Sequence, residues 1–398
     1  MDFDLTDEQE SFRKVVRDFA QHELAPHVEQ WDREHTFPVD TVLAMGELGL
    51  FGLPFPAEYG GSDSDFTTLC LAIEELGRVD QSLGVTLEAG VGLGANPIYT
   101  FGTEEQKQAW LPDLCAGRAL GGFGLTEPEA GSDAGGTRTR ARLDEATGEW
   151  VIDGEKAFIT NSGTTITSLV TITARTDTAR TDTARTDKTA GTGKPEISTI
   201  IVPAGTPGFE VQPPYRKLGW HASDTHGLTF TDCRVPAGNL LGERGRGFAN
   251  FLAVLDDGRV AIAALALGLI EACLAESVEY AKNRNAFGKP IGSYQAVAFK
   301  CADLAVMADT ARALVYRAAW LKDTGRPFKK EAAMAKLYAT EAAVTATREA
   351  TQIFGGYGFI DETPVARYYR DAKILEIGEG TSEVQRLVIS RQLGLPVD

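Results

Sequence analysis

Two changes of residue pattern constrain the fold of this chain more than any other feature of its sequence. Up to about residue 120, apolar residues recur at helical spacing, and from there to about Pro236 β-branched residues, glycines and period-two alternation dominate. Helical spacing then returns and continues to the end. At roughly 150 residues per domain, the length of 398 residues suggests two or three domains. The sequence therefore predicts an α+β multidomain protein with a helical domain (1–120), a β-sandwich or barrel domain (121–237) and a helical bundle (238–398).

The helical character of the first domain is supported by local start and stop signals. Thr6 and Gln9, and again Thr103 and Gln106, have the spacing of a capping box, in which each side chain bonds to the other residue's backbone amide. Residues 66–77 also have helical spacing and end at a glycine.

The middle domain contains a tandem repeat that does not fit a strand. Val170, Ile172 and Ala174 alternate with polar residues, and residues 197–202 are apolar and β-branched, so both segments predict strands. Between them, Thr-Ala-Arg-Thr-Asp occurs three times over residues 173–187 and is followed by a polar stretch. Such low hydrophobicity cannot offset the entropy of ordering, and each Arg is matched by an Asp. We therefore interpret the repeat as a mobile loop rather than a basic docking arm.

The last domain reads as long helices joined by short turns, which is typical of a four-helix bundle. We expect the last helix to begin at Ser382, because Ser382 and Gln385 have capping-box spacing. The other predicted helices cover residues 258–284, about 293–323 and 329–354, with a further one beginning near Pro364.

Composition excludes several classes of partner. The net charge of −17 disfavours nucleic acid, which requires basic clusters. The longest apolar run, 260–270, is far shorter than the roughly 20 residues that span a membrane, and the acidic start lacks a signal core. The five widely spaced cysteines are expected to be reduced thiols. We therefore expect a soluble cytoplasmic protein.

The common catalytic motifs are missing from the sequence. We find no phosphate loop of the Walker type, no Gly-x-Gly-x-x-Gly between a strand and a helix, and no Gly-x-Ser-x-Gly elbow. The five histidines form no His-Glu-x-x-His pair, and we expect structural or solvated roles for His221 and His226. Metal catalysis and serine hydrolysis are therefore disfavoured, and we predict no metal.

Three segments remain as candidates for chemistry: 123–133, 280–291 and 370–385. The first is a Gly- and Pro-rich loop whose open amides suit a phosphorylated or heteroaromatic ligand, although it could also be a simple turn. The second places basic residues at a helix end, where they also favour the helix dipole. In the third, glycines flank Glu379 just before a helix begins, so the carboxylate is either a proton acceptor or only a partner of that dipole.

In order and spacing, the three segments together resemble the acyl-CoA dehydrogenase family. They look like its flavin loop, its Arg-x-x-Phe-Gly segment and its Glu-Gly-Thr catalytic loop, and the resemblance covers essentially the whole chain. Short-chain members are most similar, notably over residues 101–110. The resemblance implies the acyl-CoA dehydrogenase fold, an FAD cofactor, an acyl-CoA substrate from fatty acid β-oxidation and a homotetramer. It also implies an electron-transfer flavoprotein as the electron acceptor.

The family's functional residues carry over by similarity onto matching positions. For the substrate these are Ser132, Asp256, Arg259 and Gly380, with residues 85–101 lining the acyl pocket, for which we favour short chains. For FAD, some of the matching residues would act across a subunit boundary. The full set of predicted cofactor-binding residues is Phe123, Leu125, Thr126, Ser132, Phe158, Ile159, Thr160, Arg284, Phe287, Gln295, Gln352, Gly355, Gly356, Thr381 and Glu383.

The resemblance also implies the mechanism. Glu379 would remove the α-proton while the β-hydride moves to flavin N5, which gives a trans-2-enoyl-CoA. Hydrogen bonds to the thioester carbonyl, from the Glu379 amide and a flavin ribityl hydroxyl, would stabilise the developing enolate, and desolvation would raise the basicity of the carboxylate. Some relatives carry the base at the position of Gly258, which cannot serve here. Gly378 replaces a frequent aromatic residue and would widen the pocket.

Two other functions fit the same residues. One is a flavin oxidase of this fold that uses molecular oxygen, which oxygen consumption without a protein acceptor would reveal. The other is a non-catalytic acyl-CoA or flavin binding protein, which the presence of Glu379 disfavours.

Overall fold

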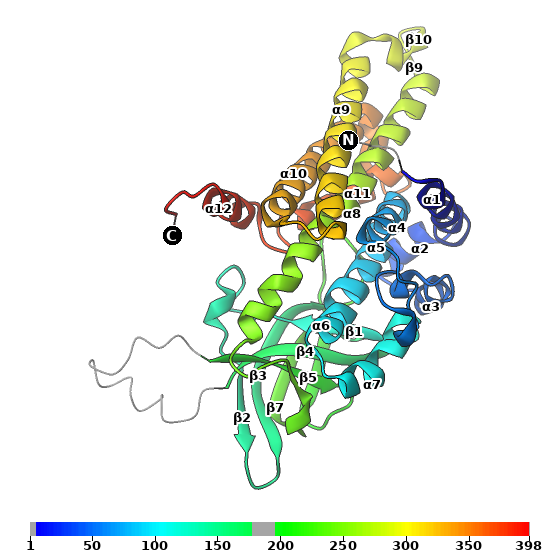
Figure 1. Cartoon of the computed structure of the whole chain (residues 1–398). Helices are drawn as coiled ribbons and strands as arrows, with labels where there is room; N and C mark the ends of the chain where they lie inside the picture. The colour runs from blue at the N-terminus through cyan, green and yellow to red at the C-terminus, as the bar shows by residue number, and fades with distance from the viewer. Residues whose placement is uncertain (1–4, 177–195, 398) are drawn as a thin grey trace.

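Figure 1 shows a computed structural model that describes residues 5–176 and 196–397. Helices of the first and last parts of the chain pack together, and a sheet lies at one end of them. The predicted order of a helical part, a sheet and a second helical part is confirmed.

The amino-terminal helices begin where the sequence signals predict. Both capping boxes form, with Thr6 accepting from the Gln9 amide and Thr103 accepting from the Gln106 amide. The helices are α1 (Asp7–Phe19), α2 (Val28–Glu34), α3 (Val39–Glu47), α4 (Phe66–Val79), α5 (Gln81–Glu88), α6 (Asn96–Phe101) and α7 (Glu104–Cys115), with π-helical turns at Ala20–Leu24 and Ala89–Ala95.

The middle part forms one eight-stranded sheet in the order β6-β7-β3-β2-β4-β5-β8, with β1 paired in parallel to β4. The strands are β1 (Leu120–Gly124), β2 (Arg140–Asp144), β3 (Glu149–Thr160), β4 (Thr167–Arg175), β5 (Ile197–Pro203), β6 (Phe209–Pro214), β7 (Thr225–Pro236) and β8 (Leu240–Leu241). β4 and β5 are the two strands that the sequence predicts around the repeat. The first three repeat residues, Thr173–Arg175, belong to β4 rather than to a loop, because Thr173 is fully buried on the sheet. The predicted mobile loop otherwise falls on residues 177–195, outside the described residues.

The carboxy-terminal helices form the predicted bundle, with one wrong start. α8 begins at Gly247, eleven residues before the predicted start at residue 258, so Gly258 lies inside the helix. The elements are α8 (Gly247–Asn283), β9 (Asn285–Ala286), β10 (Lys289–Pro290), α9 (Gln295–Asp323), α10 (Lys329–Phe354), α11 (Pro364–Leu375) and α12 (Ser382–Gln392).

α8 is the central helix of the molecule. Its length and hydropathy would suffice to cross a membrane, but 78% of its most apolar 18-residue window is buried inside the protein, which is typical of a core helix. It lies so close to α4 that a Cβ on Gly268 would come within 2.3 Å of the Glu74 carbonyl oxygen. One apolar core therefore joins both helical parts of the chain, while the sheet has a separate core.

Candidate active site

The loop between α11 and α12 holds Glu379 in a left-handed conformation. Its φ is +54° and that of Gly380 is +88°, a region that non-glycine residues rarely enter. The following helix starts because the Thr381 hydroxyl caps it, accepting from the Val384 amide at 3.3 Å. The predicted capping box at Ser382 is wrong, because Ser382 is already the first helical residue and its cap is the preceding threonine.

Two buried side chains fix this loop through its carbonyl groups. Lys336 Nζ, on α10, donates to the Gly380 oxygen at 2.8 Å. Gln385 Nε2 donates to the Gly380 oxygen at 2.8 Å and to the Glu379 oxygen at 3.2 Å. Lys336 was not predicted from the sequence to belong to the site, and Gln385, which ends the candidate segment 370–385, was predicted only as the capping partner of Ser382. A lysine within a long, uninterrupted alanine-rich helix was the only signal for Lys336.

The Glu379 carboxyl group points into the protein, and one of its oxygens forms no hydrogen bond with the described part of the chain. Its Oε2 is buried and has no hydrogen-bond partner within the described residues. Burial raises the pKa of Glu379 to about 7, while the positive charges of Arg259 and Lys336 act against that rise. A Cβ on Gly258 would lie 2.6 Å from this Oε2, so the side chain reaches the surface of α8. A carboxyl group with a pKa near neutrality and a free oxygen has the properties of a general base.

The predicted substrate residues Asp256 and Arg259 lie on α8 beside this carboxyl group. Arg259 is only 4% exposed and forms an ion pair with Asp256, and its Nε has no partner among the described atoms. Burial raises the pKa of Asp256, and the charge of Arg259 opposes that rise. The structure therefore places Asp256 and Arg259 near Glu379, whose loop also contains Gly380.

The predicted flavin loop lies at the junction of the sheet and α8. The Phe123 ring stacks on Phe251 with centroids 3.9 Å apart, and both belong to a small cluster with Leu125 and Val254. The Thr126 carbonyl accepts from the Ala157 amide of β3 at 2.9 Å, which ties this loop to the strand that carries the next predicted segment.

Only part of that segment, 158–160, is accessible to a ligand. Phe158 has a φ of +61° and is 64% exposed, with its ring centroid 5.0 Å from that of Tyr215. The Ile159 side chain is buried in the sheet core, so only its backbone is accessible to a ligand. Thr160 is half-buried and Ser132 is exposed.

A buried ion pair, which no sequence motif indicated, anchors the flavin loop. Glu127 accepts from Lys156 Nζ at 2.8 Å, from the Arg138 amide at 2.6 Å and from the Thr139 amide at 3.0 Å. Lys156 is fully buried, and Glu127 is nearly so. The Lys156 charge and these hydrogen bonds lower the pKa of Glu127 to about 2 despite burial, so the carboxylate stays ionised at neutral pH.

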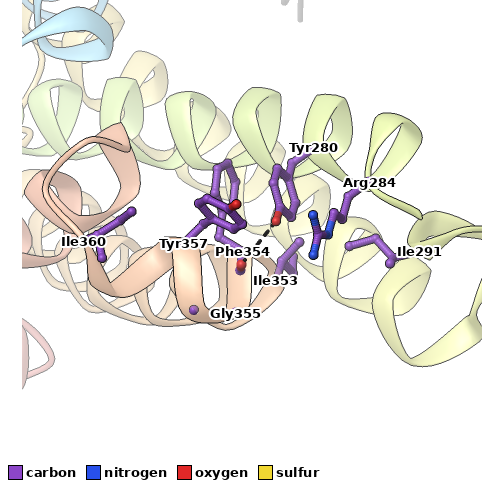
Figure 2. A pocket seen from close by; sticks show the side chains of 9 residues that line it. Tyr280, Arg284, Ile291, Ile353, Phe354, Gly355, Tyr357 and Ile360 are labelled. Atoms are coloured by element: carbon purple, nitrogen blue, oxygen red, sulfur yellow. Dashed lines mark hydrogen bonds between the residues drawn. The ribbon is translucent and has the colours of Figure 1, made fainter. Parts of the chain in front are cut away.

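A second group of predicted cofactor residues lies at the far end of the bundle. Arg284, Gly355 and Gly356 line a pocket of about 530 Å³, where Tyr280 donates to the Phe354 carbonyl at 3.3 Å (Figure 2). Phe287, Gln295 and Gln352 are exposed nearby in the chain but do not line this pocket, and Thr381 and Glu383 lie on the Glu379 side.

The two groups are too far apart for one cofactor within one subunit. Gly258, beside Glu379, is near the start of α8, and Arg284 directly follows its end. At 1.5 Å per residue, these positions are roughly 40 Å apart along the helix, which exceeds the length of a dinucleotide cofactor.

The residues present fit a flavin dinucleotide. Exposed aromatic rings at Phe158 and Phe287 suit stacking against a heteroaromatic ring, and the Arg284 guanidinium suits a pyrophosphate. Glycines 355 and 356 leave open backbone in the pocket, where a Cβ would meet no atom within 4 Å.

His221 and His226, for which the sequence predicts structural or solvated roles, each contact a carboxylate. His226 bonds to Asp224 at 2.7 Å and His221 to Asp32 at 2.9 Å, both at partly buried positions. Within residues 5–176 and 196–397, no group of three His, Cys, Asp or Glu residues could hold a metal ion.

Family profiles match almost the entire chain. Residues 6–118 match the acyl-CoA dehydrogenase N-terminal domain, 122–233 the middle domain and 245–394 the C-terminal domain. The chain belongs to the acyl-CoA dehydrogenase family. Acyl-CoA dehydrogenases are FAD-dependent enzymes, and the family and cofactor expected from the sequence are thereby confirmed.

Individual relatives are similar to this chain over essentially their full length. A Bacillus subtilis protein named "Probable acyl-CoA dehydrogenase YngJ" is 52% identical over 393 residues, covering 99% of this chain and 100% of the relative. The structure of butyryl-CoA dehydrogenase from Megasphaera elsdenii has a TM-score of 0.92 and 43% identity, covering 99% of this chain and 100% of that one.

Two further solved structures are similar to the chain over nearly its whole length. A chain from a study of the electron transferring flavoprotein of Acidaminococcus fermentans has a TM-score of 0.92 and 44% identity, with 99% of both chains covered. A glutaryl-CoA dehydrogenase from Mycobacterium smegmatis in complex with FADH2 has a TM-score of 0.89 and 31% identity, covering 98% of this chain and 95% of that one.

Proposed function

We propose that this enzyme oxidises a short acyl-CoA to its trans-2-enoyl-CoA with FAD, and that Glu379 is the base that removes the α-proton. The observation that carries the proposal is the buried, unpartnered Oε2 of Glu379, whose pKa burial raises to about 7. A carboxyl group with that pKa is partly ionised at neutral pH, and its free oxygen can accept a proton.

The neighbouring cations suit this role. Arg259 and Lys336 favour the ionised form of Glu379 and so prevent burial from leaving it permanently protonated. Lys336 also donates to the carbonyl of Gly380, so one side chain both fixes the loop and supplies charge.

The same loop can hold the thioester. The Glu379 amide donates to no acceptor within the described residues, so it is free to donate to a thioester carbonyl. Because Gln385 and Lys336 hold the two adjacent carbonyls, the amide is fixed in place before substrate binds. A preorganised donor of this kind stabilises the charge that develops as the α-proton leaves.

The chemistry that bound FAD would supply is an acceptor, its N5 atom, for the β-hydride of the substrate. The loop with Phe123, Leu125 and Thr126 and the exposed Phe158 ring would hold the FAD ring system on the Glu379 side. The pocket with Arg284, Gly355 and Gly356 would hold the distal end of FAD from another subunit, since its own Glu379 is too distant. We therefore propose a homotetramer, or at least a dimer, as the active form.

The electron acceptor and the setting are proposed from the comparisons. The similarity to a chain from the Acidaminococcus fermentans study supports an electron-transfer flavoprotein as the acceptor. The similarity to butyryl-CoA dehydrogenase supports a short acyl chain and a place in fatty acid oxidation, which we expect to occur in the cytoplasm.

Anaerobic titration tests the proposed reaction directly. We expect butyryl-CoA to bleach the visible absorbance of the FAD-loaded enzyme and to yield an enoyl-CoA that mass spectrometry detects at two hydrogens less. Failure of every acyl-CoA in a graded panel to bleach the flavin-loaded protein would contradict the proposal. Rapid oxygen consumption without a protein acceptor would instead indicate an oxidase.

A further inference from the structure

Glu88 is a second buried carboxyl group that the proposed mechanism does not use. It is the last residue of α5, directly before the π-helical turn Ala89–Ala95, and it is 2% exposed. Its Oε1 is buried and has no hydrogen-bond partner within the described residues. Buried polar groups nearly always form hydrogen bonds, so a buried carboxyl oxygen without a partner requires an explanation.

Glu88 and Glu379 converge on one point of α8. A Cβ on Gly258 would lie 2.6 Å from Glu379 Oε2 and 3.4 Å from Glu88 Oε1. A Cβ on Gly92, in the π-helical turn, would also lie 3.4 Å from Glu88 Oε1. The small residues at 258 and 92 therefore leave room around two carboxyl oxygens that have no partner.

The charges around Glu88 and Glu379 indicate which of the two carboxyl groups is protonated. Arg259 and Lys336 act on Glu379 and favour its ionised form. Glu88 has no ion pair among the described residues, and burial together with the Glu379 charge raises its pKa well above the usual range. Two buried carboxyl groups this close do not both ionise, so Glu88 carries the proton and its O–H is a donor without an acceptor.

We propose that Glu88 is a specificity residue that donates a hydrogen bond to an oxygen on the acyl chain, a few carbons beyond the α-carbon. The favoured substrates would be short acyl-CoA thioesters that carry a hydroxyl or carbonyl oxygen, rather than plain alkyl chains. This inference rests on the proposed function, because it takes Glu379 to mark the position of the α-carbon. A site built to bond a substrate oxygen discriminates strongly against analogues that lack it.

The test compares substrates that differ only by a methyl and a hydroxyl group. Pentanoyl-CoA is paired with 4-hydroxybutanoyl-CoA, and hexanoyl-CoA with 5-hydroxypentanoyl-CoA. For each pair, kcat/KM is measured on the FAD-loaded full chain and on Glu88→Leu and Glu88→Gln, and the hydroxyl-to-methyl ratio is compared. Leucine removes the donor at similar size, while glutamine keeps a donor.

We expect the ratio in at least one pair to fall about tenfold or more from wild type to Glu88→Leu, and glutamine to retain most of it. A purely structural role would lower both members of a pair equally and leave the ratio unchanged. An unchanged ratio in both pairs would overturn the proposal for Glu88. If Glu88→Leu fails to fold, the wild-type enzyme still decides the matter, because the absence of a hydroxyl preference in both pairs would also overturn the proposal.

Failure of the underlying reaction is distinguishable from failure of this inference. Loss of flavin bleaching with every substrate, including butyryl-CoA, would contradict the proposed function itself. Bleaching by butyryl-CoA without any change of the ratio would leave that function intact and remove only the role of Glu88.

Discussion

The Glu379 carboxyl group and any side chain at position 258 compete for the same space. Glycine allows the carboxyl group to rest against α8, since a Cβ there would lie 2.6 Å from Glu379 Oε2. That helix position would otherwise favour alanine, because glycine lowers helix stability by about 1 kcal/mol. Gly258 therefore lowers the stability of α8 at a position that faces the proposed base.

Replacing Gly258 should lower the activity of the enzyme without lowering its stability. For Gly258→Ala we expect an unchanged or slightly higher melting temperature, because helix propensity improves, and a loss of kcat/KM of at least about tenfold, because Glu379 is displaced. Thermal unfolding and acyl-CoA-dependent flavin reduction measure the two effects. Full activity in this variant would show that the carboxyl group does not need its observed position.

The raised pKa of Glu379 predicts a pH dependence. The base must be ionised, and its pKa is raised by burial to about 7. The proton therefore leaves as pH rises through about 7, and kcat/KM should rise over that range and decline below it. A pH profile of anaerobic flavin reduction checks this limb. An unperturbed carboxylate would give constant activity down to about pH 5.

At this scale, the sequence predicted residues within motifs and missed residues outside them. Glu379, Asp256 and Arg259 were found by resemblance to short segments. Lys336 was not predicted, because it acts through contacts with an element far away in the chain and no spacing rule predicts such contacts. Glu88 lies within residues 85–101, which were predicted to line the acyl pocket, but no pattern singled it out. The burial of the Ile159 side chain could have been predicted. Successive residues of a strand face opposite sides of the sheet, and the neighbouring Phe158 faces outward.

At the scale of elements, the errors concern the cap of α12 and the start of α8. α12 begins at Ser382 as predicted, but its cap is Thr381; both residues are good caps, and only the backbone decides between them. α8 was predicted to start at residue 258 but begins at Gly247. Phe251 and Val254, in the part that the prediction left out, are buried in the cluster with the flavin-loop residues Phe123 and Leu125, so packing extends the helix towards the sheet.

The flavin loop itself depends on the buried pair of Glu127 and Lys156. For Lys156→Met we expect a loss of unfolding free energy of about 3–5 kcal/mol, because Glu127 would remain buried without its cation. Chemical denaturation measures this loss, and weaker FAD retention should accompany it. The surface pair of Arg118 and Asp113 provides the control, since Arg118→Met should cost no more than about 1 kcal/mol. Equal effects of the two variants would contradict an anchoring role.

At the scale of the whole molecule, several large apolar side chains in the carboxy-terminal part are exposed. Phe287 is 95% exposed, Phe359 is 90% exposed, and Phe299 and Val306 on α9 are each more than 60% exposed. We propose that these exposed side chains belong to the interface between subunits. They lie on the same bundle as the pocket that is too far from its own Glu379.

We therefore expect an oligomer in solution whose assembly and FAD binding are coupled. Analytical ultracentrifugation should give a mass of at least twice the 42.8 kDa of one chain. Arg284→Glu should weaken FAD binding at least about tenfold without lowering the melting temperature of the protein freed of FAD, because the residue is exposed in one subunit. A monomer that retains FAD and full activity would contradict this arrangement. In the sequence such residues are only scattered aromatic side chains, so the surface on which they lie could not be predicted from it.

The central claim is that Glu379 removes the α-proton, and single-turnover flavin reduction tests it most directly. Glu379→Gln keeps the shape and the loop contacts, which involve only backbone carbonyls, and should bind FAD and butyryl-CoA normally. Glu376→Gln, which removes a partner of Lys373 on the same loop, serves as the control. We predict that Glu379→Gln slows anaerobic flavin reduction by saturating butyryl-CoA by about a thousandfold or more, while the control stays near wild type. Near-normal reduction in Glu379→Gln would contradict the account.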